Sequence, residues 1–206
     1  MSGVEPVRVL IAEDQLMMRS ALAALLGLEP DLAVVAEVGR GDGIVAAAVA
    51  SRADVAVLDI ELPGGSGLDV IPELLEAVPG IVVLVVTTFG RPGYLRRALD
   101  AGARGFLVKD DPVEELAAAI RQVLAGETVV NPVLAAASLS SGPNPLTERE
   151  RDTLAAGADG ASVADIAASL HLSTSTVRNY LSSAIGKTGA RNRTEAQVHA
   201  RDRGWL

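Results

Sequence analysis

The chain has 206 residues, enough for one large or two small domains, and 49% are hydrophobic. No apolar run reaches the roughly 18 residues of a membrane span, and no signal peptide is recognisable, which predicts a cytoplasmic protein without membrane contact. Cysteine is absent, which excludes disulfides and thiolate chemistry. The net charge of -8 is unevenly distributed, because the stretch after Leu170 holds 6 Lys and Arg against 2 Asp and Glu. A basic end on an acidic chain favours either a nucleic-acid contact or a solvated charged face.

Apolar, β-branched runs alternate with helically spaced segments over the first 126 residues. The predicted strands are Val7–Ala12, Ala33–Glu37, Asp54–Asp59, Ile81–Thr87 and Arg104–Val108. The predicted helices cover residues 15–28, 42–52, 67–77, 92–101 and 112–125. Five alternations with nearly all-apolar strands predict an α/β fold, a doubly wound five-stranded parallel sheet with helices on both faces. Such sheets carry their sites at the carboxyl ends of the strands.

The remainder of the chain changes character twice. Residues 127–144 have the Pro, Ser and Gly content of a linker, with a short Ala-rich helix predicted at 133–139. Residues 145–206 show only helical patterns, which predicts a small all-α domain of four helices. The predicted helices are Thr147–Ala156 with a capping box to Glu150, Ser162–Leu170, Ser173–Lys187, and a last one from near Thr194.

Polar side chains stand at the carboxyl ends of four predicted strands. Those residues are Glu13 and Asp14 after the first strand, Asp59 after the third, Thr87 at the end of the fourth, and Lys109 after the fifth. Singly they are ordinary turn, packing and solvated residues, but a parallel sheet brings them to one edge. Three gathered carboxylates repel one another unless a cation holds them, and oxygen ligands with room for water suit Mg²⁺. An Asp beside such an ion can form an aspartyl phosphate, with the hydroxyl and the ammonium contacting phosphoryl oxygens.

Four motifs carry a family resemblance over about residues 6–126. They are Ile-Ala-Glu13-Asp14-Gln, Leu-Asp59-Ile-Glu-Leu-Pro-Gly, Val-Thr87-Thr-Phe89 and Gly-Phe106-Leu-Val-Lys109-Asp, and they resemble the receiver domain of two-component response regulators. The resemblance implies a flavodoxin-like receiver domain at 1–126, Mg²⁺ as cofactor and a sensor histidine kinase as partner. It implies that Asp59 accepts the phosphoryl group, with Thr87 and Lys109 acting on it. Glu13, Asp14, Asp59 and the Ile60 carbonyl would hold the metal, and Thr87 with Phe106 would form the switch, although core packing explains Phe106 equally well.

The third helix of the C-terminal region has two distinct faces. Val177, Leu181 and Ile185 form an apolar stripe at i, i+4 and i+8. Arg178 and Ser182 share another face, beside Asn179. Arg reads guanine and Asn reads adenine in the major groove, so a helix-turn-helix that binds DNA is one interpretation and an ordinary helical bundle the other.

A second resemblance covers residues 145–206. It rests on Leu146-Thr-Glu-Arg-Glu, Ile166-Ala, Leu172-Ser-Thr-Ser-Thr-Val-Arg-Asn-Tyr, Lys187 and Ala190-Arg-Asn-Arg-Thr-Glu-Ala. With these stretches the region is similar to the LuxR-type four-helix DNA-binding domain. Together with the receiver it implies the NarL/FixJ subfamily, transcription factors that bind promoter DNA, work with RNA polymerase and are not enzymes. Lys187, Arg191 and Arg193 are then predicted to contact phosphates. Two departures, Val163-Ala164 where relatives often carry Asn-Lys and Gly186 inside the recognition helix, predict weak DNA binding by a monomer.

A narrower resemblance rests on three short stretches. Glu13-Asp14-Gln15, Thr87–Tyr94 and the terminal Arg-Gly-Trp205 are similar to regulators of the DesR type, which are linked to membrane lipid desaturation.

The first predicted helix is almost uncharged, with Arg19 the single charge in Leu16–Leu28. If Leu22, Leu25 and Leu26 face the sheet, an apolar patch of Met17, Ala21 and Ala24 stays outward, joined by Ala117 and Ala118 of the last receiver helix. Exposed apolar patches usually mark a partner surface, which predicts a homodimer of the phosphorylated chain. The alternative is that alanine is merely a good helix former.

Two other classes of protein remain as alternatives to a regulator. Asp59-Ile-Glu61 is similar to the Asp-x-Asp of haloacid-dehalogenase phosphatases, but those enzymes need a second Asp as general acid. A protein-interaction module that has lost DNA binding is the second, and Arg178, Asn179 and Lys187 argue against it. Turnover of a phosphomonoester and a gel shift with promoter DNA distinguish the three.

Overall fold

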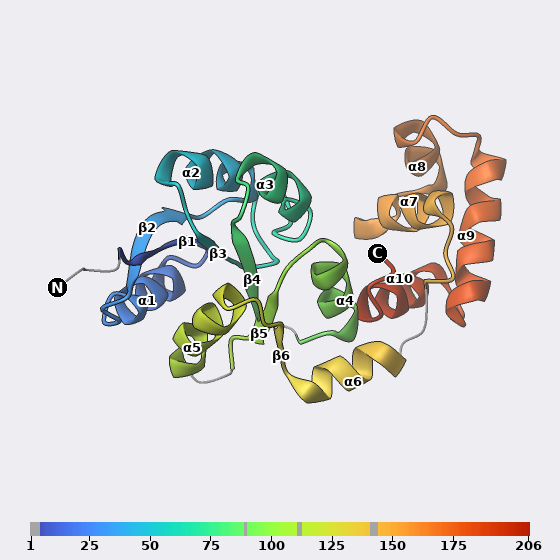
Figure 1. Cartoon of the computed structure of the whole chain (residues 1–206). Coiled ribbons are helices and arrows are strands. Elements are labelled where there is room, and N and C mark those ends of the chain that lie inside the picture. The colour runs from blue at the N-terminus through green and yellow to red at the C-terminus, as the bar shows by residue number, and fades with distance from the viewer. Residues whose placement is uncertain (1–4, 89, 111–112, 141–143) are drawn as a thin grey trace. The chain divides into compact units, whose positions relative to one another are not determined.

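A computed structural model describes the chain apart from four short stretches (Figure 1). The described residues are 5–88, 90–110, 113–140 and 144–206. Phe89 of the Thr87–Tyr94 motif, Pro112 in the last predicted receiver helix, and linker residues 141–143 lie outside them. None of the described helices is long and apolar enough to cross a membrane.

The chain divides into two compact units. The first unit is Met1–Gly90 with Arg97–Leu134, and the second is Arg91–Arg96 with Ala135–Leu206. The predicted linker, 127–144, contains the short strand β6 (Val129–Val130) and the helix α6 (Pro132–Ser140). The Asn131 side chain accepts a hydrogen bond from Val133 N–H at 3.0 Å, which satisfies a donor in the first turn of α6.

A parallel sheet forms the centre of the first unit. Its strands are β1 (Val7–Ala12), β2 (Leu32–Val38), β3 (Val55–Leu58), β4 (Val82–Thr87), β5 (Gly105–Val108) and β6, in the order β2-β1-β3-β4-β5-β6. All neighbouring strands pair in parallel. β3 is buried along its whole length, as its unbroken apolar sequence requires when helices cover both faces of a sheet. The predicted parallel α/β fold is confirmed.

The sheet has one strand more than predicted. β6 adds only two residues, which pair with Gly105 and Phe106 of β5. Val129 N–H also donates to the Arg104 carbonyl at 2.9 Å. Two residues are too few for any apolar alternation to appear, so the sequence pattern does not reveal this strand.

Helices cover both faces of the sheet (Figure 1). They are α1 (Leu16–Leu26), α2 (Ile44–Ser51), α3 (Ile71–Ala77), α4 (Pro92–Asp100) and α5 (Val113–Leu124), and a 3₁₀ turn at Gly41–Gly43 precedes α2. α1 and α5 pack together over one face, where Leu22, Leu26 and Ile120 join Val9 and Leu84 of the strands in one core. α2 and α3 pack against each other on the opposite side.

The second unit contains a four-helix domain whose starts follow the predicted caps. The helices are α7 (Glu148–Ala156), α8 (Val163–Ser169), α9 (Thr174–Thr188) and α10 (Arg193–Asp202). Thr147 and Ser162 cap α7 and α8 in capping boxes, and Ser173 caps α9. Asn192, not foreseen as a cap, opens α10 by accepting from Glu195 N–H. Val177 and Leu181 are buried in the common core, as the predicted apolar stripe requires, and Ile185 packs against it half-buried.

Candidate functional site

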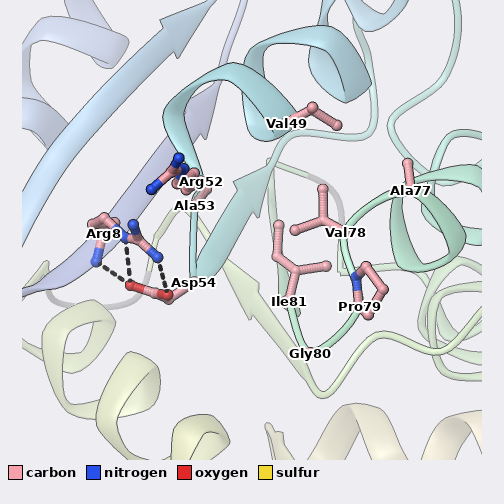
Figure 2. Close-up of a pocket in the computed structure, with 10 residues that line it drawn as sticks. All are labelled: Arg8, Val49, Arg52, Ala53, Asp54, Ala77, Val78, Pro79, Gly80 and Ile81. Carbon is pink, nitrogen blue, oxygen red and sulfur yellow. Dashed lines mark hydrogen bonds and ion pairs between the residues drawn. The ribbon is translucent and has the colours of Figure 1, made fainter.

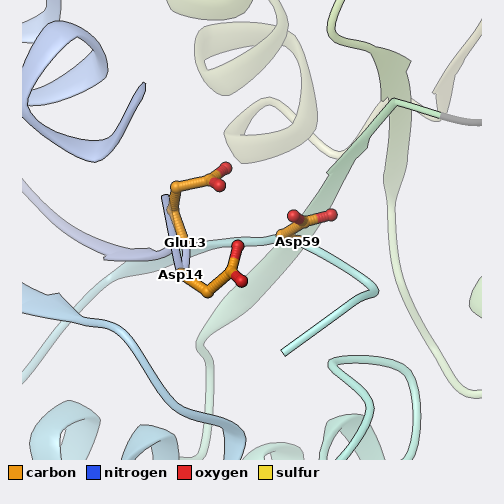
Figure 3. A group of neighbouring side chains, drawn as sticks. All are labelled: Glu13, Asp14 and Asp59. Atoms are coloured by element: carbon orange, nitrogen blue, oxygen red, sulfur yellow. The ribbon is translucent and has the colours of Figure 1, made fainter. Parts of the chain in front are cut away.

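Three carboxylates from two strand ends converge at one edge of the sheet (Figure 3). Glu13 and Asp14 follow β1, Asp59 follows β3, and one carboxylate oxygen of each lies within 4.8 Å of the others. Glu13 and Asp59 are buried, whereas Asp14 is exposed. The parallel sheet therefore brings together the acidic residues that the strand ends predict.

Lys109, which follows β5, forms ion pairs with the two buried carboxylates. Its Nζ lies 2.6 Å from Glu13 Oε2 and 2.8 Å from Asp59 Oδ2. Burial lowers the pKa of Lys109, but hydrogen bonds and charge from Asp59 and Glu13 outweigh burial and leave the pKa above its usual 10.5. Lys109 is therefore a fixed cation, and it ties the ends of three strands together.

The loop after β3 aims Asp59 into this cluster. Ile60 N–H donates to Asp59 Oδ1 at 2.7 Å, which leaves Oδ2 on the side of Lys109. Gly67 N–H donates to the Ile60 carbonyl at 3.0 Å, and a Cβ at Gly67 would overlap the Asp59 carbonyl oxygen. Only glycine allows the loop to close this tightly.

Arg19 of α1 contacts the backbone of Glu13 in the cluster. Its Nη1 donates to the Glu13 carbonyl at 2.5 Å, and its Nε lies 3.7 Å from Glu37 Oε2 at the end of β2. The sequence interpretation gave Arg19 no role, although a lone charge in an apolar helix was a signal that it has an internal partner.

The donor set fits a hard divalent cation. Three carboxylates with one exposed member offer oxygen ligands and access for water, which Mg²⁺ prefers. Glu13, Asp14 and Asp59 would hold the ion. The Ile60 carbonyl, predicted as a further ligand, already accepts the Gly67 hydrogen bond and has one lone pair left.

The two predicted switch residues lie on neighbouring strands, β4 and β5. Thr87, the last residue of β4, is buried, and Phe106 of β5 has no exposed surface. Val85 of β4 is the register partner of Phe106, so the aromatic ring belongs to a strand directly beside Thr87. Both the switch role and the core role of Phe106 are compatible with this burial.

A cavity of about 280 Å³ lies at the opposite end of the strands, where β1 and β3 begin (Figure 2). Arg8 forms a bidentate pair with Asp54, with hydrogen bonds of 3.1 and 2.9 Å that lower the pKa of Asp54. Val49, Val78 and Ile81 line its other walls. Arg8 and Asp54 satisfy each other, and Arg52 is the third charged residue in the lining, so this cavity gathers no cluster of carboxylates like the one at the other end of the strands.

The predicted recognition helix, α9, presents a polar face. Arg178, Asn179 and Ser182 are exposed on it, as a base-reading face requires, and Gly186 leaves open space where a side chain would stand. The three cations predicted to contact phosphates all have partners within the second unit. Lys187 Nζ lies 2.7 Å from Glu150 Oε2, Arg191 pairs with Glu195, and Arg193 Nη1 donates to the Ala161 carbonyl at 2.7 Å.

Glu150 is a functional candidate that sequence reasoning placed only in a capping box. The Lys187 ammonium, the Ser183 hydroxyl and the Thr147 N–H all donate to its carboxylate, and only 5% of the residue is exposed. Burial acts to raise the pKa of Glu150, but these hydrogen bonds outweigh it and hold the pKa at about 2, below the usual 4.5. Ser183 and Lys187 lie 33 and 37 residues away, so no local pattern reveals these two partners.

The pH dependence of stability follows from that lowered pKa. A carboxyl whose pKa is lower in the folded chain stabilises fully above pH 4.5, and the contribution disappears as the pH falls towards 2. We expect the unfolding free energy of the second unit to fall between pH 4.5 and pH 2 in wild type. In Glu150→Gln the fall over the same pH range should be smaller. The chain has one tryptophan, and Trp205 is buried in the second unit, so its fluorescence in pH-resolved unfolding of the full chain reports this. Glu148→Gln, an exposed change on the same helix, is the control, and equal pH dependence of wild type and Glu150→Gln contradicts the expectation.

The apolar face of α1 is exposed. Met17 is 87% exposed, Ala21 and Ala24 are exposed too, and Leu28 just beyond the helix is 78% exposed. Ala118 of α5 is also exposed. No residue on the exposed side of α1 is charged.

Two details of the predicted patch are wrong. Ala117 is only 5% exposed and belongs to the core under the sheet, since its neighbours Leu116 and Ile120 set the buried side of α5. Leu25, predicted to face the sheet, is partly exposed. The patch is therefore Met17, Ala21, Ala24, Leu25 and Ala118, hereafter the α1 patch.

Comparisons with known proteins cover almost the whole chain. The family model for the response regulator receiver domain matches residues 9–121, and the model for bacterial regulatory proteins of the luxR family matches residues 144–200. The chain is 43% identical to the uncharacterized transcriptional regulatory protein YvfU of Bacillus subtilis over 97% of the chain and 100% of that protein. It is 42% identical to the transcriptional regulatory protein DesR of the same organism, over 97% and 99% of the two chains. The crystal structure of the response regulator ChrA of a heme-sensing two-component system matches with a TM-score of 0.57 and 32% identity, over 98% of this chain and 100% of that one.

Proposed function

The chain belongs to the two-component response regulators that join a receiver domain to a LuxR-type helix-turn-helix, and from this we propose that phosphorylation of Asp59 controls its binding to promoter DNA. It is a transcription regulator and not an enzyme. We assign 1–126 to the receiver, 127–144 to the linker and 145–206 to the DNA-binding domain. The observation that carries the proposal is the Lys109 ammonium bridging Glu13 and Asp59 where three strands end.

Asp59 is the best-placed phosphoacceptor of the three carboxylates. Oδ1 accepts from Ile60 N–H and Oδ2 contacts Lys109, so the carboxylate is oriented before a donor arrives. Glu13 is held by Lys109 and Asp14 is exposed at the rim. Preorganised nucleophiles react faster because less ordering remains to be done at the barrier.

Phosphoryl transfer from a phosphohistidine of a sensor kinase balances without a further reactant. A carboxylate oxygen of Asp59 forms the new bond to phosphorus, the phosphorus–nitrogen bond breaks, and the kinase histidine leaves with its electron pair. Bound Mg²⁺ would supply charge neutralisation for the phosphoryl oxygens. Lys109 and the Thr87 hydroxyl would then contact those oxygens, which draws β4 and β5 towards the site. We place this chemistry in the cytoplasm, where the chain would have access to both the kinase and the promoter.

Phosphorylation is expected to need a divalent cation. Full-length protein incubated with acetyl phosphate and Mg²⁺ should gain the mass of one phosphoryl group, and EDTA should prevent the gain, because three carboxylates disfavour an incoming phosphate unless a cation is present. Intact-protein mass spectrometry measures both. Equal labelling in EDTA contradicts a metal role for Glu13, Asp14 and Asp59.

We propose that the phosphorylated receiver pairs through the α1 patch. An uncharged, exposed helix face costs little to desolvate, and pairing buries it. Pairing would bring two copies of α9 onto adjacent DNA half-sites roughly one turn apart, with RNA polymerase as the downstream partner. Two linked binding domains compensate for weak binding by one.

Met17→Asp and Ala24→Arg are expected to keep the phosphorylated chain monomeric, because each would bury an unpaired charge in the pair. Sedimentation velocity with and without acetyl phosphate measures this. Val49→Asp is the matched control, since Val49 is an exposed apolar residue of α2 outside the patch. If both patch variants dimerise like wild type, the interface lies elsewhere.

A further inference from the structure

We propose that Glu150 is a positioning residue for DNA recognition, which fixes the rotation of α9 through Ser183 and Lys187. This rests on the proposed DNA binding by α9. The group formed by Glu150, Ser183 and Lys187 is called the Glu150 clamp below.

The clamp joins two helices through one buried carboxylate. Oε1 accepts from the Ser183 hydroxyl at 2.6 Å. Oε2 accepts from Lys187 Nζ at 2.7 Å and from Thr147 N–H at 2.7 Å. The Glu150 carboxylate is therefore hydrogen-bonded to the capping box of α7 and to two residues on consecutive turns of α9.

The position of the clamp on α9 is what links it to recognition. Asn179, Ser183 and Lys187 are spaced four residues apart, so they lie along one stripe of the helix. All three have solvent-exposed surface, and Asn179 lies one turn before the first clamped residue, next to Arg178. A rotation of α9 about its axis would move Asn179 and Arg178 together, and the clamp opposes that rotation.

Apolar packing alone constrains the rotation less. The buried face of α9 consists of Val177, Leu181, Ala184 and Thr188, which are small or medium side chains. Hydrogen bonds to a charged group are directional and strong, so a buried carboxylate with three donors holds a narrower range of orientations. Loss of one partner would leave charge buried without compensation.

This assignment gives Lys187 a different role from a phosphate contact. Its side chain is 36% exposed, and its ammonium lies on Glu150. A cation that neutralises a DNA phosphate adds about 0.9 to the slope of log affinity against log salt, whereas a cation that stays paired with a protein carboxylate adds none. The two roles are therefore separable in one titration.

The experiment measures binding of the full chain, treated with acetyl phosphate and Mg²⁺, to a duplex from its own promoter region and to a scrambled duplex. Glu150→Gln and Lys187→Met should each lower promoter affinity about tenfold, with scrambled-duplex affinity and the salt slope unchanged. Ser183→Ala, which leaves the ion pair in place, should lower promoter affinity about threefold. The double variant Glu150→Gln/Lys187→Met should cost no more than one single change, because both remove the same clamp.

Controls separate positioning from folding and from the proposed function. Glu148→Gln changes the same charge on an exposed site of α7 and should bind like wild type. A merely structural role would lower both duplex affinities with the folded fraction, which Trp205 fluorescence reports. A fall of about 1 in the salt slope for Lys187→Met, with weaker binding to both duplexes, overturns the clamp in favour of a phosphate contact. Wild type without preference for the promoter duplex overturns the proposed function itself, and the inference with it.

Discussion

Asp59→Asn is expected to abolish stoichiometric phosphorylation of the chain. Asparagine keeps the shape of the side chain and the hydrogen bond from Ile60 N–H, but its amide has no anionic oxygen to attack phosphorus. Its neutral amide also leaves Lys109 with one carboxylate, Glu13, in place of two. Intact-protein mass spectrometry after acetyl phosphate and Mg²⁺ should show full labelling of wild type and essentially none of the variant.

Asp100→Asn is the matched control for this loss. Asp100 is an exposed carboxylate at the end of α4, so its replacement should leave labelling unchanged. Cleavage of the label by hydroxylamine identifies an acyl phosphate. Stoichiometric acyl-phosphate labelling of Asp59→Asn would place the acceptor on another carboxylate.

Arg178→Ala is expected to weaken specific DNA binding by about 1–3 kcal/mol, or about fivefold to 150-fold. Arg178 lies in the second turn of α9 and is exposed. The preceding residue, Val177, is buried, so its packing in the core determines the direction in which the helix presents Arg178. A bidentate contact to guanine is the strongest base-reading interaction such a side chain makes. The variant should also lose preference at one base-pair position, which competition with single-base variants of the promoter duplex measures.

The control for Arg178→Ala removes an equal charge elsewhere in the domain. Arg201 is an exposed residue of α10, and Arg201→Ala should change promoter binding much less. Binding of Arg178→Ala that equals wild type, with the base preference intact, means that α9 is not the recognition helix.

The sheet and the acidic cluster are predictable because both depend on local signals. β1 has the predicted bounds, Val7–Ala12, since an apolar run there ends at two acids. The strand ends then specify the edge at which Glu13, Asp59 and Lys109 meet. The caps of α7, α8 and α9 are equally local, and each hydroxyl stands where its helix begins.

The errors are of two kinds: helix faces that were assigned wrongly, and contacts that form only on folding. α1 is apolar nearly all round, so its pattern does not define which leucine faces the sheet, and Leu25 was misplaced. Ala117 was placed in an exposed patch although Leu116 and Ile120 mark the buried side of the amphipathic helix α5. The Glu150 clamp and the partner of Arg19 depend on residues brought together only by folding.

The most direct measurement of control by Asp59 is the affinity of the full chain for its promoter duplex, by fluorescence anisotropy, with and without acetyl phosphate and Mg²⁺. Coupling between a phosphorylation site and a binding site is typically about 1–3 kcal/mol, so the donor should tighten wild-type binding about fivefold to 150-fold. Asp59→Asn should bind at the untreated wild-type level whether or not the donor is present. Equal wild-type affinity with and without the donor, or an equal gain in Asp59→Asn, would contradict control of DNA binding through Asp59.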